Sequence, residues 1–284
     1  MDLSKIYSPR PDWVHKGAYG NVLVVGGSKL YTGAATLAGM AALRAGADMV
    51  TVCAPTRAAD VAAHETPSLM TFPLRGDHFS GRHVASVLDT AHLRRINCIV
   101  LGCGLGRHQA TIAAIAKLIS KATVPMVLDA DALRAIAQKP EVVLGKTVVL
   151  TPHIGELAIL LGQQYMDPES SSGQSFDSKI VAAKQAAAKY HAVVVLKGSV
   201  DIVTDGTSLI TNNSGTPLMT KGGFGDTLAG ICGALLARGV GLWEAGHAAA
   251  YINGAAGELA GEKKGEGLIA SDIFEYIPKV IQNN

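Results

Sequence analysis

The residues best suited to chemistry stand in one glycine-rich run, Lys221–Thr227 (KGGFGDT), which leads into an apolar segment. Small residues let a backbone approach an anion closely, and free N–H groups at the start of a helix attract negative charge. We therefore expect Gly223, Phe224 and Gly225 to bind a phosphate group. Asp226 would lie beside that group, where its carboxylate can take a proton from a substrate hydroxyl.

A structural interpretation of the same run is a glycine turn with Asp226 as the helix cap. The segment that follows favours ligand binding, because Leu228–Ala234 is apolar nearly all round and predicts a buried helix. The first N–H groups of a buried helix need partners, and a ligand anion supplies them.

Polar or glycine-rich residues also follow five short apolar runs, which are typical of strands buried on both faces. Ligands bind beyond the carboxyl ends of the strands in an open parallel sheet, so we expect these residues to face one crevice. The groups are Gly26–Ser28, Gly102–Gly104, Asp129–Asp131, Thr151–His153 and Lys197–Gly198.

Several of these side chains have two interpretations. His153 suits a binding role because imidazole titrates near neutral pH, although a lone histidine is often structural. Asp129 and Asp131 either hold Mg²⁺ through water or cap a helix that starts near Ala132. Lys197 either meets phosphate as a point charge or reaches solvent from the strand end.

The elements that must position these residues alternate along the chain. Short β-branched runs predict buried strands, and the Ala-rich segments between them predict helices, so a mainly parallel sheet covered by helices is favoured. Asp201–Asp205 and Ser208–Thr211 flank a turn at Gly206 and predict a hairpin that adds an antiparallel edge to the sheet. The other strands are expected at Asn21–Gly27, Asp48–Ala54, Cys98–Gly102, Met126–Asp129, Val148–Thr151 and Val193–Lys197.

A single domain is predicted over residues 1–284, because the one polar stretch between the helical segments does not divide the chain. The stretch Asp167–Asp177 is too short for a domain linker and is expected to be a mobile surface loop. The chain has no internal repeat. Helices are expected at Thr32–Gly46, Gln109–Ser120, Ile154–Leu161, Ser178–His191, Asp226–Arg238, Trp243–Gly261 and Ser271–Ile281.

Composition narrows the class of protein. Of 284 residues, 48% are hydrophobic, 17% are charged and 32 are glycine, which indicates a large buried α/β core with many tight turns. The net charge of +2 is not gathered into a basic run and aromatic residues are only 5%, so no nucleic-acid partner is expected. The four cysteines lack Cys-x-x-Cys spacing, which argues against a zinc knuckle.

No segment predicts a membrane partner. The most apolar stretch, Leu228–Ala260, contains charged residues and several glycines, and it is typical of two buried helices rather than of a membrane span. Residues 1–10 lack the apolar core of a signal peptide. We therefore expect a soluble, cytoplasmic enzyme.

Three motifs stand in a recognisable order along the chain: Lys16–Gly20 (KGAYG), Thr151–Glu156 (TPHIGE) and the Gly-x-Gly-Asp piece that ends at Asp226. Together they resemble the ADP/ATP-dependent NAD(P)H-hydrate dehydratases of the ribokinase-like superfamily. The Gly-x-Gly-Asp piece alone indicates only the superfamily, whereas the other two motifs narrow the resemblance to the dehydratases. The resemblance extends from about Lys16 to Ser271 and follows the family's order. Its other stretches are Thr32–Gly39, Asp129–Leu133, Val195–Gly198, Asn212–Pro217 and Gly223–Gly230.

The resemblance implies a three-layer α/β/α fold and a hydro-lyase reaction. Such enzymes remove a water molecule that has been added at C6 of the nicotinamide ring of NADH or NADPH, using ADP or ATP, and we expect Mg²⁺ to assist. Phosphoryl transfer to the C6 hydroxyl followed by loss of phosphate suits an anion site beside a base.

The resemblance also implies roles for individual residues. The base would be Asp226, which would also contact the substrate. The hydrated dinucleotide would be contacted by Ala34 or Ala35, Gly104 and His153. The nucleotide would be bound by Lys197, Gly198, Ser199, Val200 and Asp201, together with Gly223, Phe224 and Gly225.

The sequence departs from the family pattern at two of these positions. The family usually has Ser or Thr at the position of Phe224, and Pro at that of Cys103. Phe224 keeps its backbone N–H, so the anion site survives, but the site loses a hydroxyl group and the bulk of Phe224 could reshape the nucleotide pocket.

Two other functions are consistent with the same motifs. A small-molecule kinase of the superfamily, acting on a vitamin precursor or a sugar, would use the same base and anion site. A nucleotide sensor without catalysis would not need Asp226. As partners we expect the hydrated substrate, an adenine nucleotide, further copies of the chain in a homo-oligomer, and a separate epimerase chain, because residues 1–284 leave no room for an epimerase domain.

Overall fold

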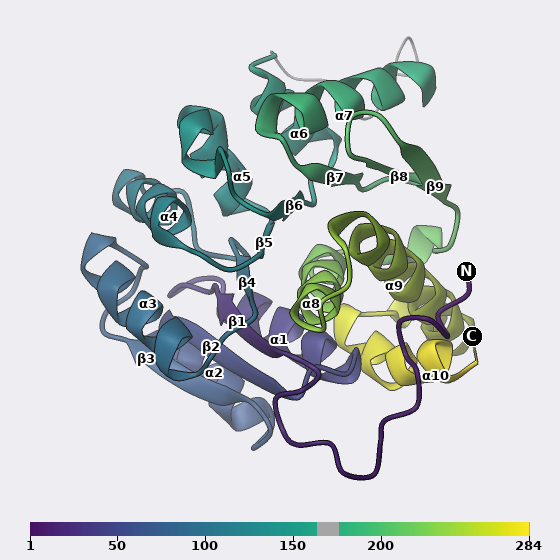
Figure 1. The fold of residues 1–284 in the computed structure, drawn as a ribbon, viewed down its shortest axis with the longest axis horizontal. Coiled ribbons are helices and arrows are strands. Elements are labelled where there is room, and N and C mark those ends of the chain that lie inside the picture. Colours follow the sequence, from purple (N-terminus) through teal and green to yellow (C-terminus); the bar gives the residue numbers. More distant parts are fainter. Residues whose placement is uncertain (164–175, 284) are drawn as a thin grey trace.

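A computed structural model describes residues 1–163 and 176–283, and a nine-stranded sheet runs through them (Figure 1). The strand order is β3-β2-β1-β4-β5-β6-β7-β8-β9. Strands β1 to β7 are parallel, β8 is antiparallel to β7, and β9 is antiparallel to β8, so the hairpin β8–β9 extends the sheet edge as the sequence predicts. The strands are β1 Asn21–Val25, β2 Met49–Pro55, β3 Met70–Leu74, β4 Cys98–Leu101, β5 Met126–Leu128, β6 Val148–Leu150, β7 Val193–Leu196, β8 Asp201–Thr204 and β9 Leu209–Asn212.

Helices cover both faces of the sheet and give three layers. One face carries α1 Ala34–Arg44, α2 Thr56–Glu65, α8 Phe224–Ala237, α9 Leu242–Lys264 and α10 Ile277–Gln282. The other face carries α3 Val84–Leu93, α4 Gln109–Lys121, α5 Asp131–Gln138, α6 Ile154–Leu161 and α7 Phe176–Tyr190.

The sheet is buried on both faces, which explains the continuous apolar runs of the sequence. In β1, Val22 and Val24 belong to one core cluster, whereas Leu23 and Val25 belong to the other. Side chains of a strand point alternately to the two faces, so a strand covered on both sides is apolar at every position.

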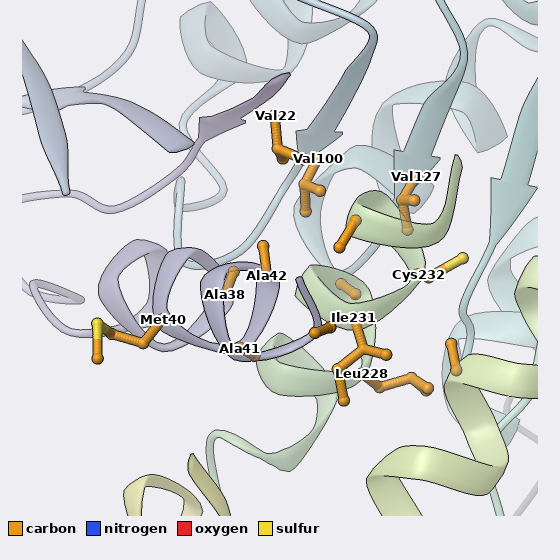
Figure 2. Close-up of a cluster of buried hydrophobic side chains, with 14 of the residues drawn as sticks. Val22, Ala38, Met40, Ala41, Ala42, Val100, Val127, Leu228, Ile231 and Cys232 are labelled. Atoms are coloured by element: carbon orange, nitrogen blue, oxygen red, sulfur yellow. The ribbon is translucent and has the colours of Figure 1, made fainter. Parts of the chain in front are cut away.

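Helix α8 packs closely against both the sheet and the neighbouring α1, with Val22, Val100 and Val127 of the sheet lying over it (Figure 2). A Cβ atom at Gly230 would lie 2.0 Å from the Ala38 carbonyl oxygen, and one at Gly233 would lie 2.3 Å from Val100 Cγ2. Only glycine fits at these two contacts, and the contacts fix the start of α8 relative to the sheet.

The structure differs from the expected elements in two segments. Residues 56–93 form α2, β3 and α3, which the sequence did not indicate; β3 lies at the sheet edge and contains Pro73, which interrupts a strand pattern. The single helix expected over Ser271–Ile281 is instead a 3-10 turn, Ala270–Glu275, followed by α10, whose first turn contains Pro278. Proline is tolerated in the first turn of a helix but not in its interior.

Two further expectations concern loops and membranes. Most of the expected loop, residues 167–175, lies outside the described residues, and its last two residues begin α7. Over residues 1–163 and 176–283, no helix combines the length and the apolar character that crossing a bilayer requires.

Candidate active site

The site lies at the point in the sheet where the strand order changes direction: β2 and β3 lie on one side of β1, and β4 and the later strands lie on the other. Strands β1 and β4 are neighbours in the sheet, although the chain first continues from β1 to β2 on the other side. The loops after β1 and β4 therefore separate, and the Gly27 N–H joins them by donating to the Cys103 carbonyl oxygen at 2.7 Å. Such a reversal is the usual position of a ligand crevice in an open α/β sheet.

Helix α8 begins at this crevice. Gly223 precedes it with φ 105°, and a Cβ atom there would lie 2.7 Å from Ala270 Cβ and 2.8 Å from Leu37 Cδ1, so both conformation and space require glycine. Across the described residues, the N–H groups of Gly223, Phe224 and Gly225 donate to no acceptor. These free donors are what an anion needs, as the sequence predicts.

A buried polar pair holds the start of α8. The Thr227 hydroxyl donates to Asn253 Oδ1 at 2.7 Å, and the Asn253 amide donates to the Phe224 carbonyl oxygen at 3.3 Å. Sequence reasoning missed Asn253, and the only signal for it is an amide inside the otherwise small and apolar middle of α9.

Asp226 lies in the first turn of α8, and Gly223 occupies the cap position that the structural interpretation gave to Asp226. Burial, followed by the negative charge of Asp129, raises the pKa of Asp226 to about 7. A hydrogen bond from the Cys103 thiol and the positive charge of Lys197 act in the opposite direction. A carboxyl group that titrates near neutrality is well suited to accept a proton from a substrate.

Lys197 points into the site rather than out to solvent. Its ammonium lies 2.8 Å from Asp129 Oδ1 and 3.8 Å from Glu156 Oε2, and its side chain is 21% exposed. Burial alone would lower the pKa of Lys197, but these two carboxylates outweigh burial and raise it, so the group stays charged. A Cβ atom at Gly225 would lie 3.2 Å from the ammonium, so the glycine lets this charge approach the start of α8.

The two aspartates after β5 have different partners, and neither side chain caps α5. Asp129 Oδ1 accepts from the Thr151 hydroxyl at 2.8 Å and from Lys197, whereas Asp129 Oδ2 has no hydrogen-bond partner among the described residues. Asp131 Oδ2 accepts from the Gly106 N–H at 2.7 Å. The capping interpretation is therefore wrong for both side chains.

One group of side chains in the described residues could hold a metal ion: ligand atoms of Cys103, Asp129 and Asp226 lie within 4.8 Å of one another. Mg²⁺ prefers oxygen ligands, so the two carboxylates suit it and the thiol does not. The free Asp129 Oδ2 could bind a hydrated cation.

His153 has a structural role that the sequence left open. Its Nδ1 accepts from the N–H groups of Gly155 at 3.0 Å and Glu156 at 3.3 Å, and the Glu156 carboxylate accepts from the His153 N–H at 2.9 Å. The pair therefore caps α6 reciprocally. His153 Nε2 lies 3.5 Å from Glu156 Oε1, and the side chain is 57% exposed, so a ligand can still contact the imidazole.

The loop Lys197–Asp201 joins β7 to β8. Asp201 accepts from the Gly198 N–H and from the Asn212 amide, both at 3.0 Å, so its carboxylate closes the loop. Burial raises the pKa of Asp201. Gly198 and Ser199 are exposed, and Val200 is half-buried, so the loop offers mainly its backbone to a ligand.

The expected dinucleotide contacts after β1 and β4 lie together. A Cβ atom at Gly104 would lie 2.8 Å from Ala34 Cβ, and Ala34 is half-buried. Ala35 is fully buried beneath it, so Ala34 is the more accessible of the two alternatives.

A family model described as NAD(P)H-hydrate dehydratase matches residues 22–279. The chain belongs to this family. The resemblance drawn from its motifs is thereby confirmed.

The chain is 38% identical to the bifunctional NAD(P)H-hydrate repair enzyme Nnr of Hyperthermus butylicus, over 99% of this chain and 52% of that protein. It therefore spans about half the length of the bifunctional relatives that it matches. It is 32% identical to a protein of Cenarchaeum symbiosum named ADP-dependent (S)-NAD(P)H-hydrate dehydratase, over 99% of this chain and 95% of that one.

Solved structures agree on the fold. The ADP/ATP-dependent NAD(P)H-hydrate dehydratase of Bacillus subtilis, co-crystallised with ATP and Mg²⁺, superposes with a TM-score of 0.77 at 25% identity, covering 97% of this chain and 93% of that one. Ribokinase of Thermotoga maritima superposes with a TM-score of 0.59 at 12% identity, covering 93% and 100%. The fold is ribokinase-like.

Proposed function

We propose that the protein removes water from C6-hydrated NADH or NADPH in a reaction that consumes ADP or ATP. The observation that carries the proposal is a carboxyl group, Asp226, whose pKa is raised to about 7 beside three unpaired N–H groups at the start of α8. Membership of the family and the printed activity of the C. symbiosum relative support it.

The proposed chemistry uses the base and the anion site together. Asp226 takes the proton of the C6 hydroxyl as the oxygen attacks the terminal phosphorus of the nucleotide, and the bond from that phosphorus to the leaving nucleotide breaks. The C6–O bond then breaks with loss of phosphate, and a proton leaves the neighbouring ring carbon to restore the double bond. Phosphate leaves far more readily than hydroxide, which explains the need for a nucleotide.

The other groups of the site have roles in binding and charge. The free N–H groups of Gly223, Phe224 and Gly225 would hold the phosphoryl group as charge develops on it. Lys197 would add a positive charge next to Gly225. Loop residues Gly198 to Asp201 would contact the nucleotide, and Ala34, Gly104 and His153 would contact the hydrated dinucleotide.

We infer that Mg²⁺ assists, held by Asp129 and Asp226 through water. Two observations support this assignment: Asp129 Oδ2 is free, and the charge of Asp129 raises the pKa of Asp226, as expected for two neighbouring carboxylates. When bound, Mg²⁺ would neutralise phosphate charge. The B. subtilis relative was co-crystallised with ATP and Mg²⁺.

We further infer that residues 1–284 fold as one domain and that the enzyme is cytoplasmic and forms a homo-oligomer. The relative of similar length from C. symbiosum supports an independent dehydratase unit. A small-molecule kinase is the alternative, and the match of residues 22–279 to the dehydratase family favours the dehydratase.

The test uses acid-hydrated NADH and hydrated NADPH with Mg²⁺ and either ADP or ATP, followed at the absorbance band of reduced nicotinamide. We expect recovery that requires one of the nucleotides. Asp226→Asn should lower turnover by about 10²–10⁴-fold while nucleotide affinity stays within a few-fold. No recovery with either nucleotide would exclude the dehydratase, and a screen of alcohols with ATP would then test the kinase.

A further inference from the structure

A tight turn, Ser28–Tyr31, carries an exposed aromatic side chain at the edge of the site. The Ser28 N–H donates to the Tyr31 carbonyl oxygen, and the Tyr31 N–H donates to Ser28 Oγ, each at 3.2 Å. Ser28 is buried, whereas Tyr31 is 54% exposed and Leu30 is 77% exposed. An aromatic ring on a fixed backbone offers a large contact area at a small cost in conformational entropy.

The turn is also fixed from outside. The Lys29 N–H donates to the Asp77 carbonyl oxygen at 2.9 Å, and its ammonium pairs with the Asp77 carboxylate at 3.0 Å. Arg57 of α2 donates to the Lys29 carbonyl oxygen at 3.3 Å. These contacts tie the turn to the loop after β3 and to α2, so Tyr31 has a defined position before any ligand binds.

Tyr31 lies close to the reacting end of the site. A Cβ atom at Gly104 would lie 2.8 Å from Tyr31 Cβ, so the two backbones are in direct contact. The residue before Gly104 is Cys103, whose sulfur lies within 4.8 Å of an Asp226 carboxylate oxygen. Within the described part of the chain the Tyr31 hydroxyl forms no hydrogen bond, so neither the ring nor its polar end is committed to the fold.

We propose that Tyr31 forms one wall of the substrate site and stacks on the hydrated nicotinamide ring, orienting the C6 hydroxyl toward Asp226; this inference rests on the proposed function. The hydrated ring keeps a conjugated carboxamide, which presents a flat surface to an aromatic side chain. The nicotinamide end is assigned rather than the adenine end because Tyr31 lies against Gly104, and the adjacent Cys103 lies beside the base Asp226.

The test compares Tyr31→Ala, Tyr31→Phe and Leu30→Ala in the dehydration assay. Loss of the ring should raise KM for hydrated NADH by about tenfold, because loss of an aromatic stack typically weakens binding by that order. Tyr31→Phe keeps the ring and should restore the wild-type KM within twofold. Leu30→Ala, the more exposed neighbour on the same turn, should leave KM unchanged, and ATP affinity should be unchanged in all three.

Hydrated reduced nicotinamide mononucleotide, which lacks the adenosine half, identifies the stacked ring. We expect Tyr31→Ala to raise its KM by the same factor as that of hydrated NADH. An effect confined to the dinucleotide, or an equal loss in Tyr31→Phe, would overturn the assignment.

Binding of NADH, followed by the fluorescence of its reduced nicotinamide, separates this inference from the proposed function. If the wild-type protein dehydrates the substrate and Tyr31→Ala leaves KM and NADH affinity unchanged, the inference fails and the function stands. If NADH binds in a Tyr31-dependent manner without nucleotide-dependent recovery, the proposed function fails, and of the inference only the contact between Tyr31 and the nicotinamide ring stands. A wild-type protein that neither dehydrates nor binds NADH would overturn both.

Discussion

The buried thiol of Cys103 lies beside the carboxylate of Asp226, with its sulfur within 4.8 Å of a carboxylate oxygen. Burial raises the pKa of the Cys103 thiol, so it remains protonated and can act as a donor. A donor to the ionised carboxylate favours ionisation, and it therefore holds the pKa of Asp226 lower than burial alone would set it.

Cys103→Ala should move the acidic limb of the pH profile of kcat/KM upward. Without the thiol the pKa of Asp226 rises, and the base is protonated over a wider range of pH, so activity is lost at a higher pH as the solution is acidified. We expect a displacement of about one pH unit, which corresponds to one hydrogen bond to a charged group.

Cys103→Ser is the matched control for this substitution, because it retains a donor of similar size. Its acidic limb should lie at or below that of the wild-type protein. A limb that moves equally in both variants would show that the thiol does not act through its hydrogen bond.

Lys197→Met should destabilise the fold as well as impair catalysis. The substitution leaves the buried Asp129 carboxylate with only the Thr151 hydroxyl as a donor, and an underpaired buried group costs about 1–3 kcal/mol. Urea unfolding of the variant should therefore show a lower midpoint with an unchanged slope.

The double variant Lys197→Met/Asp129→Asn should recover part of that stability, because it removes the carboxylate that had lost its partner. It should not recover activity. Losses that simply add in the double variant would argue against a direct interaction between the two side chains.

Gly225→Ala should weaken nucleotide binding and turnover together. The added methyl group would lie 3.2 Å from the Lys197 ammonium and 3.7 Å from Asp129 Oδ2, in the space that a phosphoryl group would use. We expect a loss of about ten- to hundredfold in kcat/KM for the nucleotide, as for displacement of one charge-stabilising group.

Gly222→Ala is the control, since a Cβ atom at Gly222 meets nothing within 4 Å. It should retain wild-type kinetics within a few-fold. Equal losses at both positions would indicate that the loop needs flexible glycine residues rather than space beside Lys197.

Asn253→Leu should lower stability by about 1–3 kcal/mol and raise KM for the nucleotide without a matching change in the pH profile. The substitution removes the amide that holds the Phe224 carbonyl oxygen and leaves the Thr227 hydroxyl with one partner fewer. Thermal unfolding and nucleotide titration together check this. A displaced acidic limb would mean that Asn253 acts on Asp226 and not on the backbone at the start of α8.

Much of the fold and of the site follows from local patterns. Uninterrupted apolar runs predict the buried strands. Because the carboxyl ends of parallel strands lie at one edge of the sheet, the polar groups after β4, β5, β6 and β7 could be assigned to one crevice. The Gly-Gly-Phe-Gly-Asp run likewise predicts an anion site, because its requirement for small residues is visible in the sequence.

What could not be predicted depends on contacts between distant segments. Cys103 in the loop after β4 lies next to Asp226 of α8, and nothing in the sequence near either residue indicates this proximity. Only the structure shows that His153 Nδ1 caps α6. The elements from α2 to α3 were not predicted from the sequence, because β3 is an edge strand with a proline and its apolar pattern is weaker than that of a central strand. The assigned nucleotide and substrate contacts remain predictions.

The contact of Gly230 with the Ala38 carbonyl oxygen has a consequence for how this active site can diversify. No side chain can be added at Gly230 without separating α8 from α1, and that separation would carry the anion site and the base with it. Sequence change is therefore open mainly at residues next to this unit, such as the buried Phe224 and Cys103 and the exposed Tyr31. New substrate preferences in chains of this kind should arise from those residues, while the geometry of phosphate and base is inherited as a single unit.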